Sequence, residues 1–219
     1  MNITRIRGVA RSEIPAVILA GGRSSRMNVP DKCLMTLGGG TVLAHVAAAL
    51  RPQVKKILIN SNSDPALFSR FDLPVLPDLL PGRPGPLAGV HTAMLWAQRL
   101  GADYVLTAPA DTPFLPGDLV TRMAPLMQYK RVIVLSDGER VHPTIGLWPV
   151  ALAARLRRDI ETGAARMQQW CRSVGVIELL YPNAGTDFFF NINTPHDLAC
   201  AAGYAESARK QEFSAVCIA

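Results

Sequence analysis

Two glycines and several basic side chains follow an apolar run near the start of the chain. The run PAVIL (15–19) has the composition of a buried strand, and AGGRSSRMNVPDK continues it as far as Lys32. Gly21 and Gly22 carry no Cβ, so a ligand can approach the main chain and its N–H groups can bind phosphate oxygens. Arg26 and Lys32 add positive charge. The segment therefore predicts a phosphate-binding loop. It matches neither GxxxxGK[ST] nor GxGxxG, and a plain glycine turn with surface charges is the alternative.

Asp111 is a second candidate, because it directly follows the apolar segment DYVLTAPA (103–110). Prolines at 109 and 113 flank it and restrict the backbone on both sides. A carboxylate fixed at a strand end can hold Mg²⁺, which prefers one or two carboxylates together with phosphate oxygens and water. A helix N-cap explains this position equally well.

Asp78 ends the segment DLPVLPD (72–78), and Asn60 and Asn62 lie at the end of the apolar segment KKILIN (55–60) and just beyond it. A carboxylate can accept two hydrogen bonds from the N1–H and 2-amino groups of guanine, a donor pair that adenine and cytosine lack. The alternative is an aspartate that makes an Asx-turn in a loop, and for this residue alone that is the simpler interpretation.

The segment FNINTP (190–195) places Asn191 and Asn193 on one side of an extended chain, with Ile192 on the other. Paired amides can bind a phosphate or a sugar, although a strand-end turn would also use them. His142 lies near a predicted hairpin and could face a cleft, but a histidine at the start of a strand is more often structural.

The elements that must position these residues alternate along the chain. Segments 15–20, 55–60, 72–78 and 103–110 are typical of strands, and 41–50, 86–100 and 116–127 are typical of helices. Further along we expect a hairpin (131–136 and 142–148, turning at Asp137–Gly138), helices over 149–161 and 164–173, a strand over 175–180 and a helix capped by Thr194. This order predicts an α/β fold with a mainly parallel sheet and an antiparallel hairpin insertion. Ligands of such sheets bind beyond the carboxyl ends of the strands, where the candidate residues would meet.

The composition limits the class of protein. The 219 residues carry a net charge of +6, which favours anionic partners, but the basic residues are spread out and only 6% are aromatic, so we expect no nucleic-acid binding. No apolar stretch reaches the roughly 20 residues of a membrane span. The four cysteines lie far apart without a CxxC, which fits a reducing, cytoplasmic environment. We expect a flexible basic extension (1–13), one domain (14–206) and a C-terminal tail (207–219).

Five motifs occur in an order that is typical of one family. They are LAGGRSSRMNVPDK (19–32), GPLAGV (85–90), PADTPFLP (109–116), DGERVHPTIGLW (137–148) and NINTPHDL (191–198). Over residues 14–206 the chain resembles the molybdenum cofactor guanylyltransferases, also called molybdopterin–guanine dinucleotide synthases. Five ordered motifs are more specific than one glycine loop and favour the functional interpretation of each candidate.

The resemblance implies a three-layer, Rossmann-like nucleotidyltransferase fold and a Mg²⁺-dependent reaction. In it, GMP passes from GTP to the terminal phosphate of molybdenum-molybdopterin, and pyrophosphate leaves. The resemblance also implies transient contact with molybdenum-insertion proteins or molybdoenzyme chaperones. By position, the resemblance assigns Leu19, Ala20, Gly21, Gly22, Lys32, Asn60, Asp78 and Asp111 to the nucleotide, Lys32, Arg26 and Asp111 to catalysis, Asp111 to the metal, and Asn191 and Asn193 to the pterin and phosphate.

One position departs from the family pattern, because Asn28 stands where the loop usually has glycine. Asparagine tolerates left-handed backbone better than most residues, so the turn can persist. Two alternatives remain at this point. A cytidylyltransferase for the same cofactor typically has LAAG where this chain has Leu19-Ala20-Gly21-Gly22, and a non-catalytic cofactor chaperone would not need the set Lys32, Asp111, Asn191 and Asn193.

Overall fold

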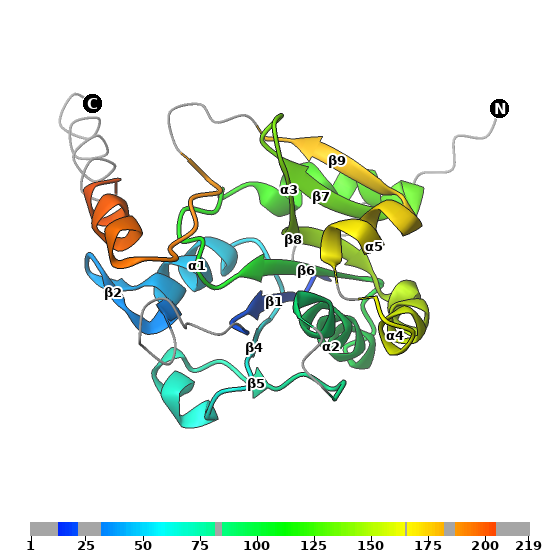
Figure 1. Cartoon of the computed structure of the whole chain (residues 1–219), viewed down its shortest axis with the longest axis horizontal. Coiled ribbons are helices and arrows are strands. Elements are labelled where there is room, and N and C mark those ends of the chain that lie inside the picture. The colour runs from blue at the N-terminus through cyan, green and yellow to red at the C-terminus, as the bar shows by residue number, and fades with distance from the viewer. Residues whose placement is uncertain (1–12, 22–31, 82–84, 165, 182–186, 205–219) are drawn as a thin grey trace.

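The computed structural model describes residues 13–21, 32–81, 85–164, 166–181 and 187–204 (Figure 1). Gly22, Arg26 and Asn28 lie outside these ranges, as do nearly all of the predicted N-terminal extension and all of the predicted C-terminal tail. In the described ranges, no helix is both long and apolar enough to cross a membrane.

The centre of the molecule is a sheet that has seven strands within the described residues, in the order β5-β4-β1-β6-β8-β7-β9. Neighbouring strands are parallel except where β8 is involved, because β8 runs antiparallel to both β6 and β7. This confirms the mainly parallel sheet and the antiparallel hairpin. The strands are β1 (Ala16–Leu19), β4 (Ile57–Asn60), β5 (Val75–Leu76), β6 (Tyr104–Pro109), β7 (Val132–Ser136), β8 (Val141–Pro149) and β9 (Val176–Leu180).

Helices cover both faces of the sheet, which makes three layers (Figure 1). All four residues of β1 are buried, and they alternate between two cores: Ala16 and Ile18 belong to one, Val17 and Leu19 to the other. A strand buried on both faces has the continuous apolar composition seen at 15–20. The labelled α-helices are α1 (Val42–Leu50), α2 (Pro86–Arg99), α3 (Leu119–Met123), α4 (Ala153–Glu161) and α5 (Met167–Val174), and residues 195–204 are also helical.

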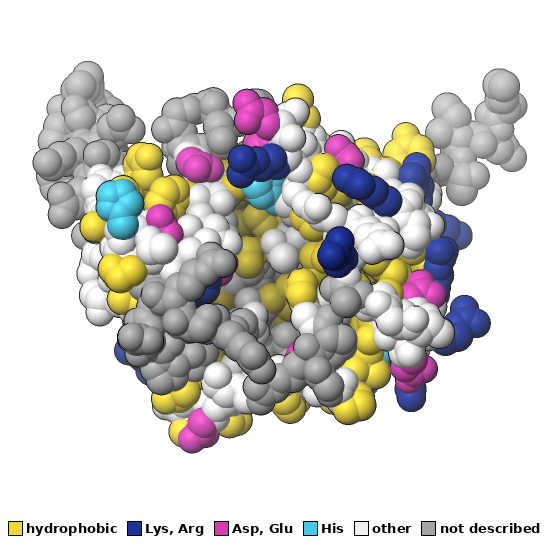
Figure 2. Space-filling model, in the orientation of Figure 1, with side chains coloured by type: hydrophobic (Ala, Val, Ile, Leu, Met, Phe, Trp, Pro, Cys, Tyr) yellow, Lys and Arg dark blue, Asp and Glu magenta, His cyan; other side chains and the backbone are white. Residues whose placement is uncertain are grey.

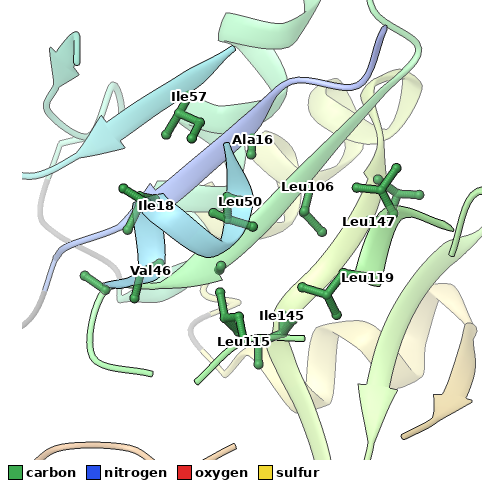
Figure 3. Close-up of a cluster of buried hydrophobic side chains, with 14 of the residues drawn as sticks. Ala16, Ile18, Val46, Leu50, Ile57, Leu106, Leu115, Leu119, Ile145 and Leu147 are labelled. Carbon is green, nitrogen blue, oxygen red and sulfur yellow. The ribbon is translucent and has the colours of Figure 1, made fainter. Parts of the chain in front are cut away.

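The first core lies between the sheet and the helices α1 and α3. Figure 3 shows Ile18 and Leu106 from the sheet beside Val46 and Leu50 from α1 and Leu119 from α3. Each of these side chains is fully buried. Burying one such side chain contributes about 1.5–3 kcal/mol to the stability of the fold. The second core packs α2, α4 and α5 against the opposite face. The two cores fix the strand ends from which the candidate residues project.

Three short elements connect the glycine-rich loop to α1. Lys32 begins a 3-10 helix (Lys32–Leu34), and the small hairpin of β2 (Thr36–Leu37) and β3 (Gly40–Thr41) follows. Thr41 caps α1, because its Oγ1 accepts a hydrogen bond from the N–H of Ala44 at 3.2 Å. Lys32 therefore lies directly before the small hairpin that leads into α1.

The predicted helix over 116–127 is shorter in the structure than expected. α3 ends at Met123, and the chain continues as a 3-10 helix (Ala124–Tyr129) with Pro125 in its first turn. Proline has no N–H to donate and its ring crowds the preceding turn, so the α-helix cannot continue through this position. The predicted cap at Thr194 is confirmed, since its Oγ1 accepts the N–H of Asp197 at 3.1 Å where a helix begins at residue 195.

Candidate functional site

The carboxyl ends of β1, β4 and β6 lie side by side, as the alternation of strands and helices predicts. Main-chain hydrogen bonds continue just past the strands, from Ala20 N to Asn60 O (2.8 Å) and from Ala110 N to Leu19 O (3.0 Å). Leu19 is buried, Ala20 half-buried and Gly21 exposed. A Cβ added to Gly21 would meet no described atom within 4 Å, so the main chain here is open to a ligand.

Lys32, Asp111 and Asn193 come together at this edge, and we call them the Lys32 cluster. The Nζ of Lys32 lies 2.5 Å from Asp111 Oδ2 and donates to Asn193 Oδ1 at 2.7 Å. The side chains of Lys32 and Asp111 are 21% and 17% exposed, so the ion pair is partly shielded from solvent. The main chain joins the same segments, since Ile192 N donates to Asp111 O at 2.9 Å.

Asp111 has one carboxylate oxygen to spare. Its Oδ1 is buried and has no hydrogen-bond partner among the described residues, while Oδ2 faces Lys32. Leaving such an oxygen without a partner is costly, so it marks a position where a cation or donor can bind. α3 begins only at Leu119, with Asp118 at its N-cap position, so Asp111 does not cap that helix.

The donor set at Asp111 fits Mg²⁺ better than a metal held by protein alone. Within the described ranges, no group of three or more His, Cys, Asp or Glu side chains could hold a metal ion. Mg²⁺ is commonly bound through one or two carboxylates, with phosphates and water filling the other positions. Asp111 is therefore the residue in the described part of the chain that would hold it.

Asn60, Asn62 and Asp78 form a second group at the same edge, which we call the Asp78 cluster. Asn60 Nδ2 donates to Asp78 Oδ1 at 3.0 Å, and Asn62 Nδ2 donates to Asp78 Oδ2 at 2.8 Å. The carboxylate thus binds the amides of Asn60 and Asn62, and among the described residues it makes no hydrogen bond to the main chain of its own loop as an Asx-turn would. The next residue is also anchored, because Leu79 N donates to Thr92 Oγ1 on α2 at 3.0 Å.

The two asparagines of NINTP have different environments. Asn193 contacts Lys32, and its main-chain N–H donates to Asp197 Oδ2 at 2.9 Å. This hydrogen bond is the largest cause that lowers the pKa of Asp197. Asn191 is exposed and makes no hydrogen bond with the described residues, while Ile192 between them is fully buried. The expected alternation is confirmed, but the structure brings only Asn193 to the Lys32 cluster.

His142 makes a contact that the sequence did not reveal. Its ring stacks on Phe189, with centroids 4.0 Å apart and planes 10° from parallel, and its Nε2 lies 2.9 Å from Asp137 Oδ2. This hydrogen bond is the main cause that lowers the pKa of Asp137 to about 2. Phe189 lies two residues before Asn191, so the hairpin supports the segment that carries both asparagines. In the sequence, the aromatic run FFF (188–190) directly before NINTP is the feature that indicates such a ring contact.

The face seen in Figure 1 is hollowed near its centre. Figure 2 shows hydrophobic atoms inside the hollow, with both basic and acidic side chains in the surface around it. A groove of about 500 Å³ lies elsewhere, lined by Lys56, Ile57 and Trp96 among others. Ile57 begins β4 whereas Asn60 ends it. This groove therefore lies at the amino ends of the strands, and the two clusters lie at the carboxyl ends.

Comparison with known proteins shows which family the chain resembles. Residues 16–176 match the MobA-like NTP transferase domain. A molybdenum cofactor guanylyltransferase of Nitrobacter hamburgensis is 41% identical over 195 residues, which cover 85% of this chain and 93% of that protein. One of Cereibacter sphaeroides is 44% identical over 185 residues, covering 84% and 93%. The chain belongs to the molybdenum cofactor guanylyltransferase family. It is therefore a nucleotidyltransferase.

The fold of the family is also seen among solved structures. Molybdopterin-guanine dinucleotide biosynthesis protein A from Archaeoglobus fulgidus superposes with a TM-score of 0.71 at 21% identity, covering 89% of this chain and all of that one. This confirms the three-layer nucleotidyltransferase fold. The family match ends at residue 176, so the segment with Asn191 and Asn193 lies beyond it, although the curated relatives cover most of the chain.

Proposed function

We propose that this protein transfers GMP from GTP to the terminal phosphate of molybdenum-molybdopterin, which yields the guanine dinucleotide form of the cofactor and pyrophosphate. The observation that carries the proposal is the placement of two complementary clusters on one sheet edge. The Asp78 cluster offers an acceptor for a base, and the Lys32 cluster offers charge for a triphosphate. Membership of the guanylyltransferase family supports the same assignment.

The Asp78 carboxylate would bind the guanine base. Its oxygens are held by Asn60 and Asn62, and each retains acceptor capacity for the N1–H and 2-amino groups. Cytosine and adenine do not present this pair of donors, so at least one free acceptor site of the half-buried carboxylate would have no hydrogen bond from the base. A site built to bind a donor pair rejects a base that lacks it.

The Lys32 cluster would act on the phosphates. A terminal phosphate oxygen of the acceptor attacks the α-phosphorus of GTP, a new P–O bond forms, and the bond to pyrophosphate breaks with its electron pair. Lys32 would stabilise the negative charge that develops on the leaving group. The attacking oxygen is already anionic, so no general base is required. Asn193 orients the Lys32 ammonium through its 2.7 Å hydrogen bond.

Asp111 would hold Mg²⁺ through its unpartnered Oδ1. When bound, the ion supplies Lewis-acid stabilisation of phosphate charge. Before substrate arrives, Asp111 would also keep Lys32 in place through their ion pair.

The remaining assignments are proposals of the same kind. The main chain at Leu19, Ala20, Gly21 and Gly22 would contact the nucleotide, Arg26 would assist at the triphosphate, and Asn191 and Asn193 would contact the acceptor. We also propose a cytoplasmic location and transient contact with molybdenum-insertion proteins or molybdoenzyme chaperones. Among the described residues, Cys171 and Cys200 form no disulfide, which supports a reducing compartment. Burial raises the pKa of the Cys171 thiol to about 12, which keeps it unreactive.

The proposal is tested by incubating the purified chain with MgCl₂, molybdenum-molybdopterin and either GTP or CTP, and following pyrophosphate release and product mass. Pyrophosphate with GTP, together with a product heavier by one GMP unit, is expected. Release with CTP instead would assign the cytidylyl reaction. GTP binding without release from either nucleotide would contradict catalysis and support a cofactor carrier.

A further inference from the structure

We propose that Asn62 is a specificity-determining residue that orients the Asp78 carboxylate toward guanine. The inference rests on the proposed function, because it concerns how the base is selected in that reaction. Asn62 lies two residues beyond the end of β4 and is half-buried, in contrast to the fully enclosed Asn60.

Asn62 and Asp78 form a reciprocal pair. Asn62 Nδ2 donates to Asp78 Oδ2 at 2.8 Å, and the main-chain N–H of Asp78 donates to Asn62 Oδ1 at 2.9 Å. One amide therefore binds both the side chain and the backbone of the same residue. This arrangement also fixes which end of the Asn62 amide carries the oxygen, since only the carbonyl can accept from an N–H.

The sheet does not hold the Asp78 carboxylate by itself. The paired register of β4 and β5 ends at Asn60 and Leu76, two residues before Asp78. Beyond that point the carboxylate is fixed by one amide donor on each oxygen, from Asn60 and from Asn62. A carboxylate oxygen has about two acceptor sites, so each keeps one for a ligand. The two amides thus determine the direction in which the free sites point.

The two amides are not equivalent. Asn60 is 2% exposed, its Nδ2 also donates to Leu76 O at 3.2 Å, and its Oδ1 would lie 2.5 Å from a Cβ added at Gly89 on α2. Replacing Asn60 would therefore disturb strand and helix packing. Asn62 makes its side-chain hydrogen bonds to Asp78 alone among the described residues, so its replacement should act on the carboxylate with little effect on the fold.

Guanine chemistry provides a direct probe of this orientation. GTP presents N1–H and a 2-amino group, whereas inosine triphosphate presents N1–H and no 2-amino group. A correctly oriented carboxylate binds both donors of GTP, and a rotated one loses alignment with at least one of them. The advantage of GTP over inosine triphosphate should therefore depend on Asn62.

The test measures kcat and KM for GTP, inosine triphosphate and CTP, by pyrophosphate release, in the wild type and in Asn62→Ala. We expect kcat/KM for GTP to fall about tenfold, mainly through KM, as for the loss of one hydrogen bond to a charged group. The ratio of GTP to inosine triphosphate should shrink, and the value for CTP should not fall. Asn62→Gln, which keeps the amide but displaces it, should reproduce the shift and serves if Asn62→Ala is unstable.

Thr92→Val is the matched control, because Thr92 Oγ1 anchors Leu79 in the same loop without touching the carboxylate. It should leave the base ratios unchanged. A wild type that prefers GTP, with the same ratios in both Asn62 variants, would overturn the inference alone. Equal shifts in Thr92→Val would overturn it in favour of general loop anchoring. A wild type without turnover of GTP would overturn the proposed function itself.

Discussion

The Asp78 cluster and the Lys32 cluster lie on the same edge of the sheet but are built in opposite ways. In the Asp78 cluster a charged group is surrounded by neutral amides, and both oxygens already have a donor. In the Lys32 cluster two opposite charges face each other 2.5 Å apart, and one oxygen of Asp111 has no hydrogen-bond partner in the part of the chain that the structure describes. The first is a preformed acceptor, whereas the second is a charge pair that a substrate must rearrange.

Under the proposed function, the Asp78 cluster would select the base and the Lys32 cluster would serve the chemical step. A rigid acceptor discriminates between bases because its geometry exists before the ligand binds, so little ordering is required on binding. A charge pair in a partly shielded site stabilises the ions of the transferring phosphate and changes partners as they arrive. We therefore expect changes in the Asp78 cluster to alter which nucleotide reacts, and changes in the Lys32 cluster to alter how fast any nucleotide reacts.

The largest effect is expected from Asp111→Asn. The substitution keeps the shape of the side chain but removes the negative charge opposite Lys32 and the ligand proposed for Mg²⁺. A bound metal ion contributes several kcal/mol of transition-state stabilisation. kcat should fall on the order of 10³-fold with GTP as the substrate. Pyrophosphate release over a Mg²⁺ titration measures it, and a thermal melt controls for folding. Wild-type turnover at saturating Mg²⁺ would remove Asp111 from the metal site.

A smaller effect is expected from Asn193→Ala, which removes the amide that orients Lys32. Loss of one hydrogen bond to an ammonium should lower kcat by about tenfold without raising the KM for GTP. Asn191→Ala is the matched control, because Asn191 does not contact Lys32 in the described structure. If both variants change only the KM for the acceptor and to the same degree, Asn193 acts by binding the acceptor and not through Lys32.

The smallest effect concerns stability and lies outside both clusters. His91 on α2 is 2% exposed, and burial, followed by the charge of Arg157, lowers its pKa below 6.5. The unfolded chain therefore binds more protons near pH 6, and the free energy of unfolding should decrease as the pH falls below about 6.5. One such group contributes at most about 1.4 kcal/mol for each pH unit.

His91→Gln should make this pH dependence shallower between pH 5 and 7, as measured by urea unfolding across that range, with kcat unchanged. His196→Gln, at an exposed helix start, is the control. The same change in slope from both substitutions would show that burial of His91 is not the cause.

Much of the fold follows from the order of apolar segments. A strand such as β1 that is buried on both faces has to be continuously apolar, so its position is evident in PAVIL. Ligands of such sheets bind beyond the carboxyl ends of the strands, and this rule predicts that Asp111 and Asn60 lie at the same end of the sheet although they belong to different segments. α3 was predicted too long, because the α-helical pattern continues through Pro125 whereas the α-helix does not.

The side-chain contacts of the site are harder to predict from the sequence than the fold. A contact between residues 161 positions apart, as for Lys32 and Asn193, follows from the motif resemblance but not from local pattern. The stack of His142 on Phe189 and the reciprocal bonds of Asn62 depend on side-chain directions at the ends of strands. Those directions are set by packing and by hydrogen-bond partners, which no periodicity in the sequence encodes.

The most direct test of the separation between selection and chemistry is one crossed measurement. kcat/KM for GTP and for CTP would be determined in parallel for the wild type, Asp78→Ala and Asp111→Asn. We predict that Asp78→Ala lowers the GTP-to-CTP ratio by about tenfold or more, as for a lost pair of base contacts, while Asp111→Asn lowers both values and leaves their ratio unchanged. If instead the two variants change both kcat/KM for GTP and the GTP-to-CTP ratio to the same degree, the two clusters form a single functional unit, and base selection is not separate from chemistry.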